Sequence, residues 1–174
     1  MTATVTPSPV VAEMGAGRPV LVLGAAPGAA GLAALAARFR LFVLADATCA
    51  ADWIAAREPG TLGVVSVGAA AGAALRLVRE LGEAADALVL VSPTGLTLGE
   101  GERLATPICV LVGDRDSSAA PLADWRRSLH ASTVLVFDAG ADILADRPDA
   151  FANAAGDFLD RKARFAFADS VALS

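Results

Sequence analysis

Six short apolar segments recur along the chain, each bounded by residues that favour turns. They are rich in Val and Leu, and they span residues 19–24, 40–46, 62–68, 86–92, 108–114 and 132–140. Strands buried on both faces of a parallel sheet have this nearly continuous apolar pattern, whereas strands with one solvated face alternate apolar and polar positions. The pattern therefore predicts six strands of a mostly parallel sheet.

Segments with helical patterning separate these apolar runs. They predict helices over residues 31–39, 50–57, 71–85, 121–130 and 148–165. The last of them has Pro148 and Asp149 in its first turn and basic residues near its end, which matches the preferences of helix termini. Since parallel strands joined by helices need right-handed crossovers, we expect a doubly wound α/β sheet of six strands with helices on both faces.

The pattern fits a single domain. We expect this domain to span residues 19–166, because no linker or long internal repeat interrupts it. Residues 1–18 are rich in Thr, Pro and Gly and are expected to form a flexible leader, and residues 167–174 are expected to form a tail.

Composition and charge narrow the classes of function. The 174 residues are 55% hydrophobic and 19% charged, which suits a folded protein with a large core. The formal net charge of -5 argues against a nucleic-acid partner, whose phosphates call for clustered Lys and Arg. Cys49 and Cys109 are too few for a disulfide framework, and His130 is the only histidine. We therefore expect no metal site and no cofactor.

One uncharged stretch, at residues 19–37, has the composition of a short membrane span. It opens with a strand-like run and is then broken by Gly24, Pro27, Gly28 and Gly31, so a strand, a turn and a helix fit it better. It also follows a polar leader instead of standing at the start of the chain. We therefore expect a cytoplasmic protein that does not bind membranes.

The predicted topology also predicts where a site would lie. Ligands of doubly wound sheets bind beyond the C-terminal ends of the strands. The loops at that edge are residues 24–31, 46–52, 68–72, 92–98, 114–120 and 139–144.

Four segments, in the order that the family requires, resemble the α/β-hydrolase superfamily. Residues 62–80 (LGVVSVGAAAGAALRLVRE) resemble the strand, turn and helix of the nucleophile elbow, with Gly68 and Gly72 at the two glycine positions of G-x-S-x-G. Residues 106–116 (TPICVLVGDRD) resemble the strand that ends in the catalytic acid. Residues 136–160 resemble the closing segment that carries the catalytic histidine, and residues 19–31 resemble the first strand and oxyanion loop.

This resemblance implies the roles of three positions. Ala70 falls where the nucleophilic serine belongs, Ala141 where the histidine belongs, and Asp116 where the acid belongs. Alanine supplies neither the nucleophile nor the base that acyl transfer needs, so we expect no conventional serine hydrolase. The resemblance also implies a spatial order of second, first, third, fourth, fifth and sixth strand. The short connection at residues 92–107 implies a lidless fold.

The first function that we consider is that of a pseudoenzyme. It would bind a small apolar molecule or acyl group, or a carrier or partner protein, in a cleft above Ala70. The residues expected to contact the ligand are Gly24, Ala25, Ala26, Asp46, Ala69, Ala70, Ala71, Pro93 and Ala141.

The second is a non-hydrolytic enzyme, such as a cyclase, an isomerase or an acyl transferase that acts on a carrier protein. Asp116, Asp142 or Asp46 would serve as acid or base, and Cys49 is a further candidate nucleophile. Asp46 and Asp116 can equally be turn-forming residues with solvated carboxylates.

The third function that we consider is that of a homodimer. It would form through a sheet edge exposed by the lack of the family's N-terminal strands, or through the last helix.

A rival interpretation concerns the first strand, loop and helix. A glycine-rich loop follows the strand at residues 19–24, and Asp46 ends the next strand about 20 residues on, as in dinucleotide-binding units. The spacing of Gly24, Gly28 and Gly31 is G-x3-G-x2-G, however, and not G-x-G-x-x-G. Dinucleotide binding therefore stays an alternative that rests on a weak motif.

Overall fold

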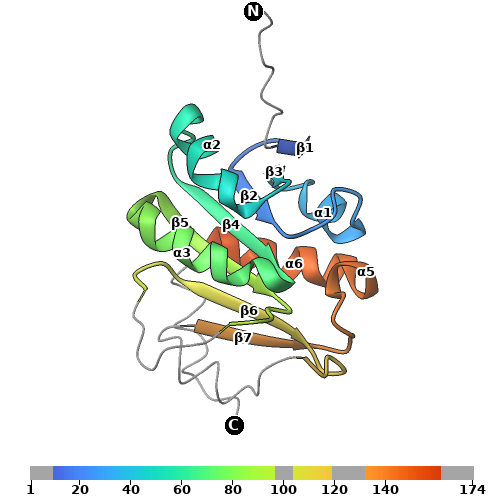
Figure 1. Cartoon of the computed structure of the whole chain (residues 1–174). Helices are drawn as coiled ribbons and strands as arrows, with labels where there is room; N and C mark the ends of the chain where they lie inside the picture. Colours follow the sequence, from blue (N-terminus) through green and yellow to red (C-terminus); the bar gives the residue numbers. More distant parts are fainter. Residues whose placement is uncertain (1–9, 97–103, 119–131, 162–174) are drawn as a thin grey trace, which may run out of the picture.

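The computed structural model describes residues 10–96, 104–118 and 132–161. Within these ranges the strands form one seven-stranded sheet of order β1-β3-β2-β4-β5-β6-β7 (Figure 1). The strands are β1 (Val10–Met14), β2 (Pro19–Leu23), β3 (Arg40–Leu44), β4 (Leu62–Val67), β5 (Ala85–Val91), β6 (Ile108–Gly113) and β7 (Ser132–Phe137). Strands β2 to β7 are all parallel, and β1 pairs antiparallel with β3. The predicted α/β class and the predicted order of the six apolar runs are confirmed.

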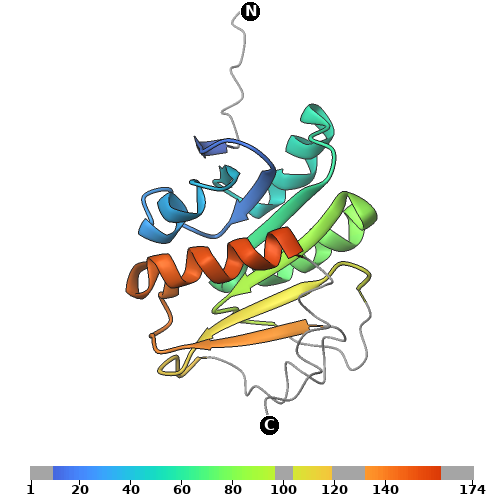
Figure 2. The same cartoon turned by 180° about the vertical axis from the view of Figure 1, so that it is seen from behind.

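Helices cover both faces of the sheet (Figures 1 and 2). The helices are α1 (Ala30–Leu35), α2 (Ala50–Arg57), α3 (Ala71–Leu81), α5 (Ile143–Asp146) and α6 (Pro148–Arg161), and the short 3-10 turns are η1 (Ala47–Cys49), η2 (Gly68–Ala70) and η3 (Gly82–Ala84). Side chains of α1, α5 and α6 pack on one face, and those of α2 and α3 pack on the other. The helix predicted at residues 121–130, with His130, lies outside the described residues. Helix α5 was not predicted.

The predicted leader is wrong for residues 10–18. Val10–Met14 forms β1, so the sheet has seven strands where six were expected. Exposure alternates along β1, and Glu13 pairs with Arg40 of β3 at 2.5 Å. A short edge strand of this kind is held by cross-strand pairs rather than by a continuous apolar run, which is why the search for such runs missed it. The predicted tail and the last residues of the predicted domain lie outside the described residues.

Glycine lets the helices on one face approach closely. A Cβ built on Gly31 of α1 would lie 2.8 Å from Cδ1 of Phe151 and 3.1 Å from the Cα of Leu144. Gly31, Phe151 and Leu144 are all buried, in a core where Phe39 and Phe158 are the other large fully buried aromatic residues. This contact places α5, and the turn before it, next to the loop that follows β2.

Arg18 connects three elements at the N-terminal edge of the sheet. Its guanidinium forms an ion pair with Asp86 of β5 and donates a hydrogen bond to the carbonyl oxygen of Leu159 in α6. The Arg18 side chain is 24% exposed and that of Asp86 is 11% exposed, so water screens the pair only in part. The segment that leads into β2 is therefore tied to the body of the fold.

We expect Arg18→Ala to lower the free energy of unfolding by about 1–3 kcal/mol, because it leaves a half-buried carboxylate and a helix-end carbonyl without this donor. Urea denaturation measures the change. Arg76→Ala, at an exposed position of α3, is the control and should change stability by less than about 0.5 kcal/mol. Equal stability of the two variants would show that the Arg18 contacts contribute nothing.

Candidate functional site

A sharp turn joins β4 to α3 at the C-terminal edge of the sheet. Strand β4 ends at Val67, and the next residue, Gly68, has a left-handed φ of +58°. Ala70 has an ordinary helical φ of -72°. A Cβ built on Gly68 meets no atom within 4 Å, so the tip of the turn faces open space. In a nucleophile elbow the serine occupies the strained position of such a turn, and here that position is Gly68, two residues before Ala70.

The sequence motif alone did not distinguish these two positions. Counting glycines places Gly68 and Gly72 at the ends of the motif and Ala70 at its centre. Counting from the end of the strand instead places Gly68 at the centre of the motif. Ser66 and Ala70 then occupy the two flanking positions, where the motif has glycine. Of the two candidate centres, Gly68 directly follows the end of β4 and has the left-handed backbone.

The loop after β2 packs directly against this turn. Gly24 has a φ of +76°, and a Cβ built on it would lie 2.5 Å from the carbonyl oxygen of Val67 and 2.7 Å from the Cβ of Ala70. Only glycine combines the left-handed backbone with so close an approach. Gly24 of the predicted dinucleotide loop thus packs on the neighbouring strand-to-helix turn.

A pocket of about 280 Å³ opens beside the turn, and we call it the elbow pocket. Its lining residues are Gly24, Ala25, Ala26, Ala29, Val67, Ala141, Asp142 and Leu144. They come from the loop after β2, the end of β4, and the turn and helix after β7, so three strand ends converge here. The lining is largely apolar, with one carboxylate among the residues named.

The elbow pocket brings together five residues singled out from the sequence. Gly24, Ala25, Ala26 and Ala141 were expected to contact a ligand, and Asp142 was a candidate acid or base. The other lining residues are Ala29 and Leu144, which lie in the predicted site loops 24–31 and 139–144, and Val67, which lies outside the predicted loops. Such small or apolar residues have no chemical signature, and the fold alone brings them to the pocket.

Other candidate residues lie outside this lining. Ala69 is exposed, Ala70 is half-buried, and Ala71 and Pro93 are buried. Two more, Asp46 and Cys49, lie in the loop after β3. The Asp46 carboxylate caps η1 by accepting a hydrogen bond from the Thr48 backbone N–H at 2.9 Å, which is a turn-forming role. Cys49 is a half-buried free thiol at the start of α2.

Asp116 follows β6 and has one satisfied and one unsatisfied carboxylate oxygen. Its Oδ1 accepts hydrogen bonds from the backbone N–H and the Oγ of Ser118, at 2.9 and 2.6 Å. Its Oδ2 is buried and has no hydrogen-bond partner among the residues that the structure describes. Buried polar atoms without partners are rare and often mark a functional position.

The loop that carries Asp116 lies against the turn that carries Ala141. The Arg115 backbone N–H donates to the carbonyl oxygen of Ala139 at 3.1 Å, and the Ala139 N–H donates to Oδ1 of Asp114 at 3.2 Å. Asp142 is exposed, and its Oδ1 caps α5 by accepting from the Ala145 N–H at 3.1 Å. The loops after β6 and β7 are thus joined by backbone hydrogen bonds beside the elbow pocket.

In the part of the chain that the structure describes, no group of three or more His, Cys, Asp and Glu residues could hold a metal ion. None of the described helices combines the length and the apolar character that crossing a bilayer requires.

The chain is similar to known proteins in structure but not detectably in sequence. No protein-family model matches the chain, and no curated protein is similar to it in sequence. A predicted CIB-like hydrolase from Thermoplasma acidophilum is 14% identical, with 89% of this chain and 88% of that chain covered and a TM-score of 0.69. An α/β hydrolase enzyme from the metagenome of sediments of the lagoon of Mar Chica, Morocco, is 15% identical, with 86% and 94% covered and a TM-score of 0.71. The chain has the α/β-hydrolase fold.

A third relative is the type II thioesterase BorB from the borrelidin biosynthetic cluster. It is 18% identical to this chain, with 87% of this chain and 95% of BorB covered and a TM-score of 0.67. The resemblance deduced from the four sequence segments is therefore confirmed at the level of the α/β-hydrolase fold. Identities this low show the shared fold and leave activity to be argued from the site itself.

Proposed function

We propose that this chain is a non-hydrolytic protein with the α/β-hydrolase fold that binds a small apolar ligand, such as an acyl group, in the elbow pocket. The observation that carries the proposal is the combination of an open apolar pocket with Gly68, which has no side chain, at the strained position of the turn. The turn keeps the backbone of an elbow while offering no nucleophile there.

The same conclusion holds for either alignment of the elbow. Acyl transfer by this fold needs a hydroxyl or thiol nucleophile and a base within hydrogen-bond reach. Neither Gly68 nor Ala70 supplies a nucleophile, and Ala141 lines the pocket where an imidazole would be needed. Among the described lining residues, Asp142 is the one ionisable group, and its Oδ1 already caps α5.

The size of the pocket limits the ligand. About 280 Å³ is at the lower end of the range for small-molecule sites, so a short acyl chain or a similarly small apolar molecule suits it. The structural similarity to the thioesterase BorB supports an acyl group as the ligand class.

Filling the pocket should abolish binding. We expect Ala26→Phe to weaken binding of S-hexanoyl-N-acetylcysteamine at least about tenfold, because the ring would occupy the space that the acyl chain needs. Isothermal titration calorimetry measures the affinity. Ala33→Phe is the control, since Ala33 is an exposed residue of α1 outside the pocket lining. Equal affinity of both variants would place the ligand elsewhere, and hydrolysis of the thioester well above the buffer rate would reject a non-hydrolytic role.

A second candidate function is a non-hydrolytic enzyme that uses Asp116 as acid or base. The observation that favours it is the buried Oδ2 of Asp116, for which the described part of the chain offers no hydrogen-bond donor. Because the reaction is unknown, the test is a screen of acyl thioesters for products other than the free acid. Asp116→Asn should abolish any turnover found, and Cys49→Ala should not; unchanged turnover in Asp116→Asn would remove Asp116 as the acid or base.

A further inference from the structure

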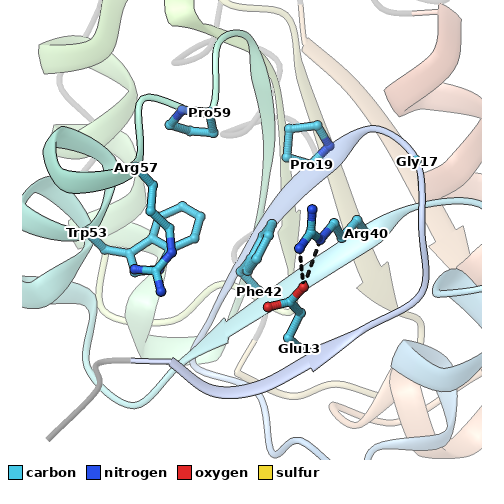
Figure 3. Close-up of a pocket in the computed structure, with 8 residues that line it drawn as sticks. All are labelled: Glu13, Gly17, Pro19, Arg40, Phe42, Trp53, Arg57 and Pro59. Atoms are coloured by element: carbon cyan, nitrogen blue, oxygen red, sulfur yellow. Dashed lines mark hydrogen bonds and ion pairs between the residues drawn. The ribbon is translucent and has the colours of Figure 1, made fainter.

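A second pocket, drawn in Figure 3, lies at the N-terminal ends of β2 and β3, whereas the elbow pocket lies beyond the C-terminal ends of β2 and β4. Its volume is about 290 Å³. Pro19 and Arg40, the first residues of β2 and β3, contribute to its wall, and Arg57 and Pro59 contribute from the end of α2. Nothing in the proposed function uses this pocket, which we call the arginine pocket.

Two aromatic rings form the base of the arginine pocket. Phe42 and Trp53 are 7% and 2% exposed, and their ring centroids lie 4.7 Å apart. A guanidinium carbon lies over each ring: that of Arg40 is 5.1 Å from the Phe42 centroid, and that of Arg57 is 5.3 Å from the Trp53 centroid. Cation–π contacts of this kind hold both arginine side chains beside the pocket.

The two arginines differ in their partners. Nε and Nη2 of Arg40 both donate to the same oxygen of Glu13, at 2.8 and 2.5 Å, as the dashed lines in Figure 3 show. Arg57 has no carboxylate partner among the described residues, and its ring contact with Trp53 leaves its guanidinium N–H groups available. With two guanidiniums and one carboxylate, the pocket carries one excess positive charge in a chain whose net charge is -5.

These observations specify the chemistry of a ligand. A guanidinium presents a planar fork of donors that matches a carboxylate, and stacking on an aromatic ring holds that fork in place. The walls that contain Pro19 and Pro59, and the aromatic base, suit an apolar body attached to the carboxylate. Within residues 10–96, 104–118 and 132–161, the buried indole N–H of Trp53 also finds no hydrogen-bond acceptor, so one donor of the lining is unsatisfied there.

We propose that the arginine pocket binds a small organic carboxylate, whose carboxylate pairs with Arg57 and whose apolar body packs between the walls that contain Pro19 and Pro59, beside the arginine-covered rings. Glu13 competes with the ligand for Arg40, so it limits the affinity. The residues that line the arginine pocket are all different from those that line the elbow pocket.

Benzoate is the probe for this site, with benzamide as the neutral analogue of the same shape. Isothermal titration calorimetry on the full chain should show saturable binding of benzoate and none of benzamide. We expect Arg57→Gln to weaken benzoate binding at least about tenfold, because it removes the charged fork. Glu13→Gln should tighten binding severalfold, because it frees Arg40. Arg76→Gln, at an exposed arginine outside the pocket lining, should leave the affinity unchanged.

Several outcomes would overturn the proposal. They are no heat of binding at about 10 mM benzoate, ten times a Kd of about 1 mM, equal affinity for benzamide, equal affinity for inorganic phosphate, or an unchanged affinity in Arg57→Gln. Quenching of tryptophan fluorescence by benzoate should disappear in Trp53→Phe, and its persistence would place the probe elsewhere. Thermal melting of each variant shows whether it folds. The increase in benzoate affinity expected from Glu13→Gln tests the site without removing any contact to the ligand.

Discussion

Gly113→Ala is expected to lower the free energy of unfolding by about 3 kcal/mol or more, because the added methyl group has no space. A Cβ at Gly113 would lie 2.1 Å from the carbonyl oxygen of Gly140 and 2.4 Å from that of Ala139. These are backbone atoms, so no change of rotamer relieves the clash. The Ala139 carbonyl is also held by the Arg115 N–H at 3.1 Å, so the turn cannot move without losing a hydrogen bond.

Urea denaturation of Gly113→Ala measures this loss, and Gly28→Ala is the matched control. A Cβ on Gly28 meets no atom within 4 Å, and its φ lies outside the left-handed range. The control should therefore stay within about 1 kcal/mol of the parent, with any gain coming from reduced freedom of the unfolded chain. If the two variants are equally stable, the turn after β7 does not pack as closely against Gly113 as the structure indicates.

The second large effect is expected on esterase activity, in the double variant that combines Gly68→Ser with Ala141→His. The double variant should hydrolyse p-nitrophenyl butyrate at least about 100-fold faster than Gly68→Ser alone, because a general base contributes about 10²–10⁴ in rate. The space at Gly68 is open for the new side chain. The left-handed backbone costs the serine only about 1–2 kcal/mol.

The expected mechanism of the double variant uses the unpartnered oxygen of Asp116. The introduced imidazole would take the proton of the serine hydroxyl while its other nitrogen donates to the buried Oδ2 of Asp116. Adding Asp116→Asn should then remove most of the gain. This result would also show that the loops after β6 and β7 present the acid and the base to the same turn.

The matched comparison is Ala70→Ser combined with Ala141→His. We expect this variant to stay at the level of the parent, because Ala70 lies in a helical conformation beyond the tip of the turn. Activity in the Ala70 variant and not in the Gly68 variant would favour the alignment by glycine spacing. Inactivity of both would contradict the positions inferred for Ala141 and Asp116.

Much of the fold could be predicted from local patterns. The continuous apolar runs predicted six parallel strands, and α2 and the start of α6 lie where the patterning and Pro148 placed them. Such patterns are visible because a strand buried on both faces must be apolar at nearly every position. Strand β1 was not predicted, because its formation depends on pairing with β3, including the ion pair between Glu13 and Arg40.

Of the two pockets, one could be predicted in part from the sequence and the other could not. The rule that ligands bind at strand C-termini, together with the resemblance, led to Gly24, Ala25, Ala26 and Ala141, which line one pocket in the structure. The arginine pocket had no such signal, since its aromatic base and its charges come from β1, β3 and α2.

The sequence by itself determined the α/β class and the positions of the six parallel strands, because strands buried on both faces must be apolar at nearly every position. The strand order came from the resemblance to the α/β-hydrolase superfamily, and the rule for doubly wound sheets pointed to the strand ends where the elbow pocket opens. Only the tertiary structure decided that Gly68 and not Ala70 has the left-handed backbone, and that Arg57 lies over Trp53 without a carboxylate partner among the described residues. Backbone angles at a turn depend on where the strand ends, and pairing of charges depends on contacts between distant segments. Neither property is encoded in the local pattern of residues.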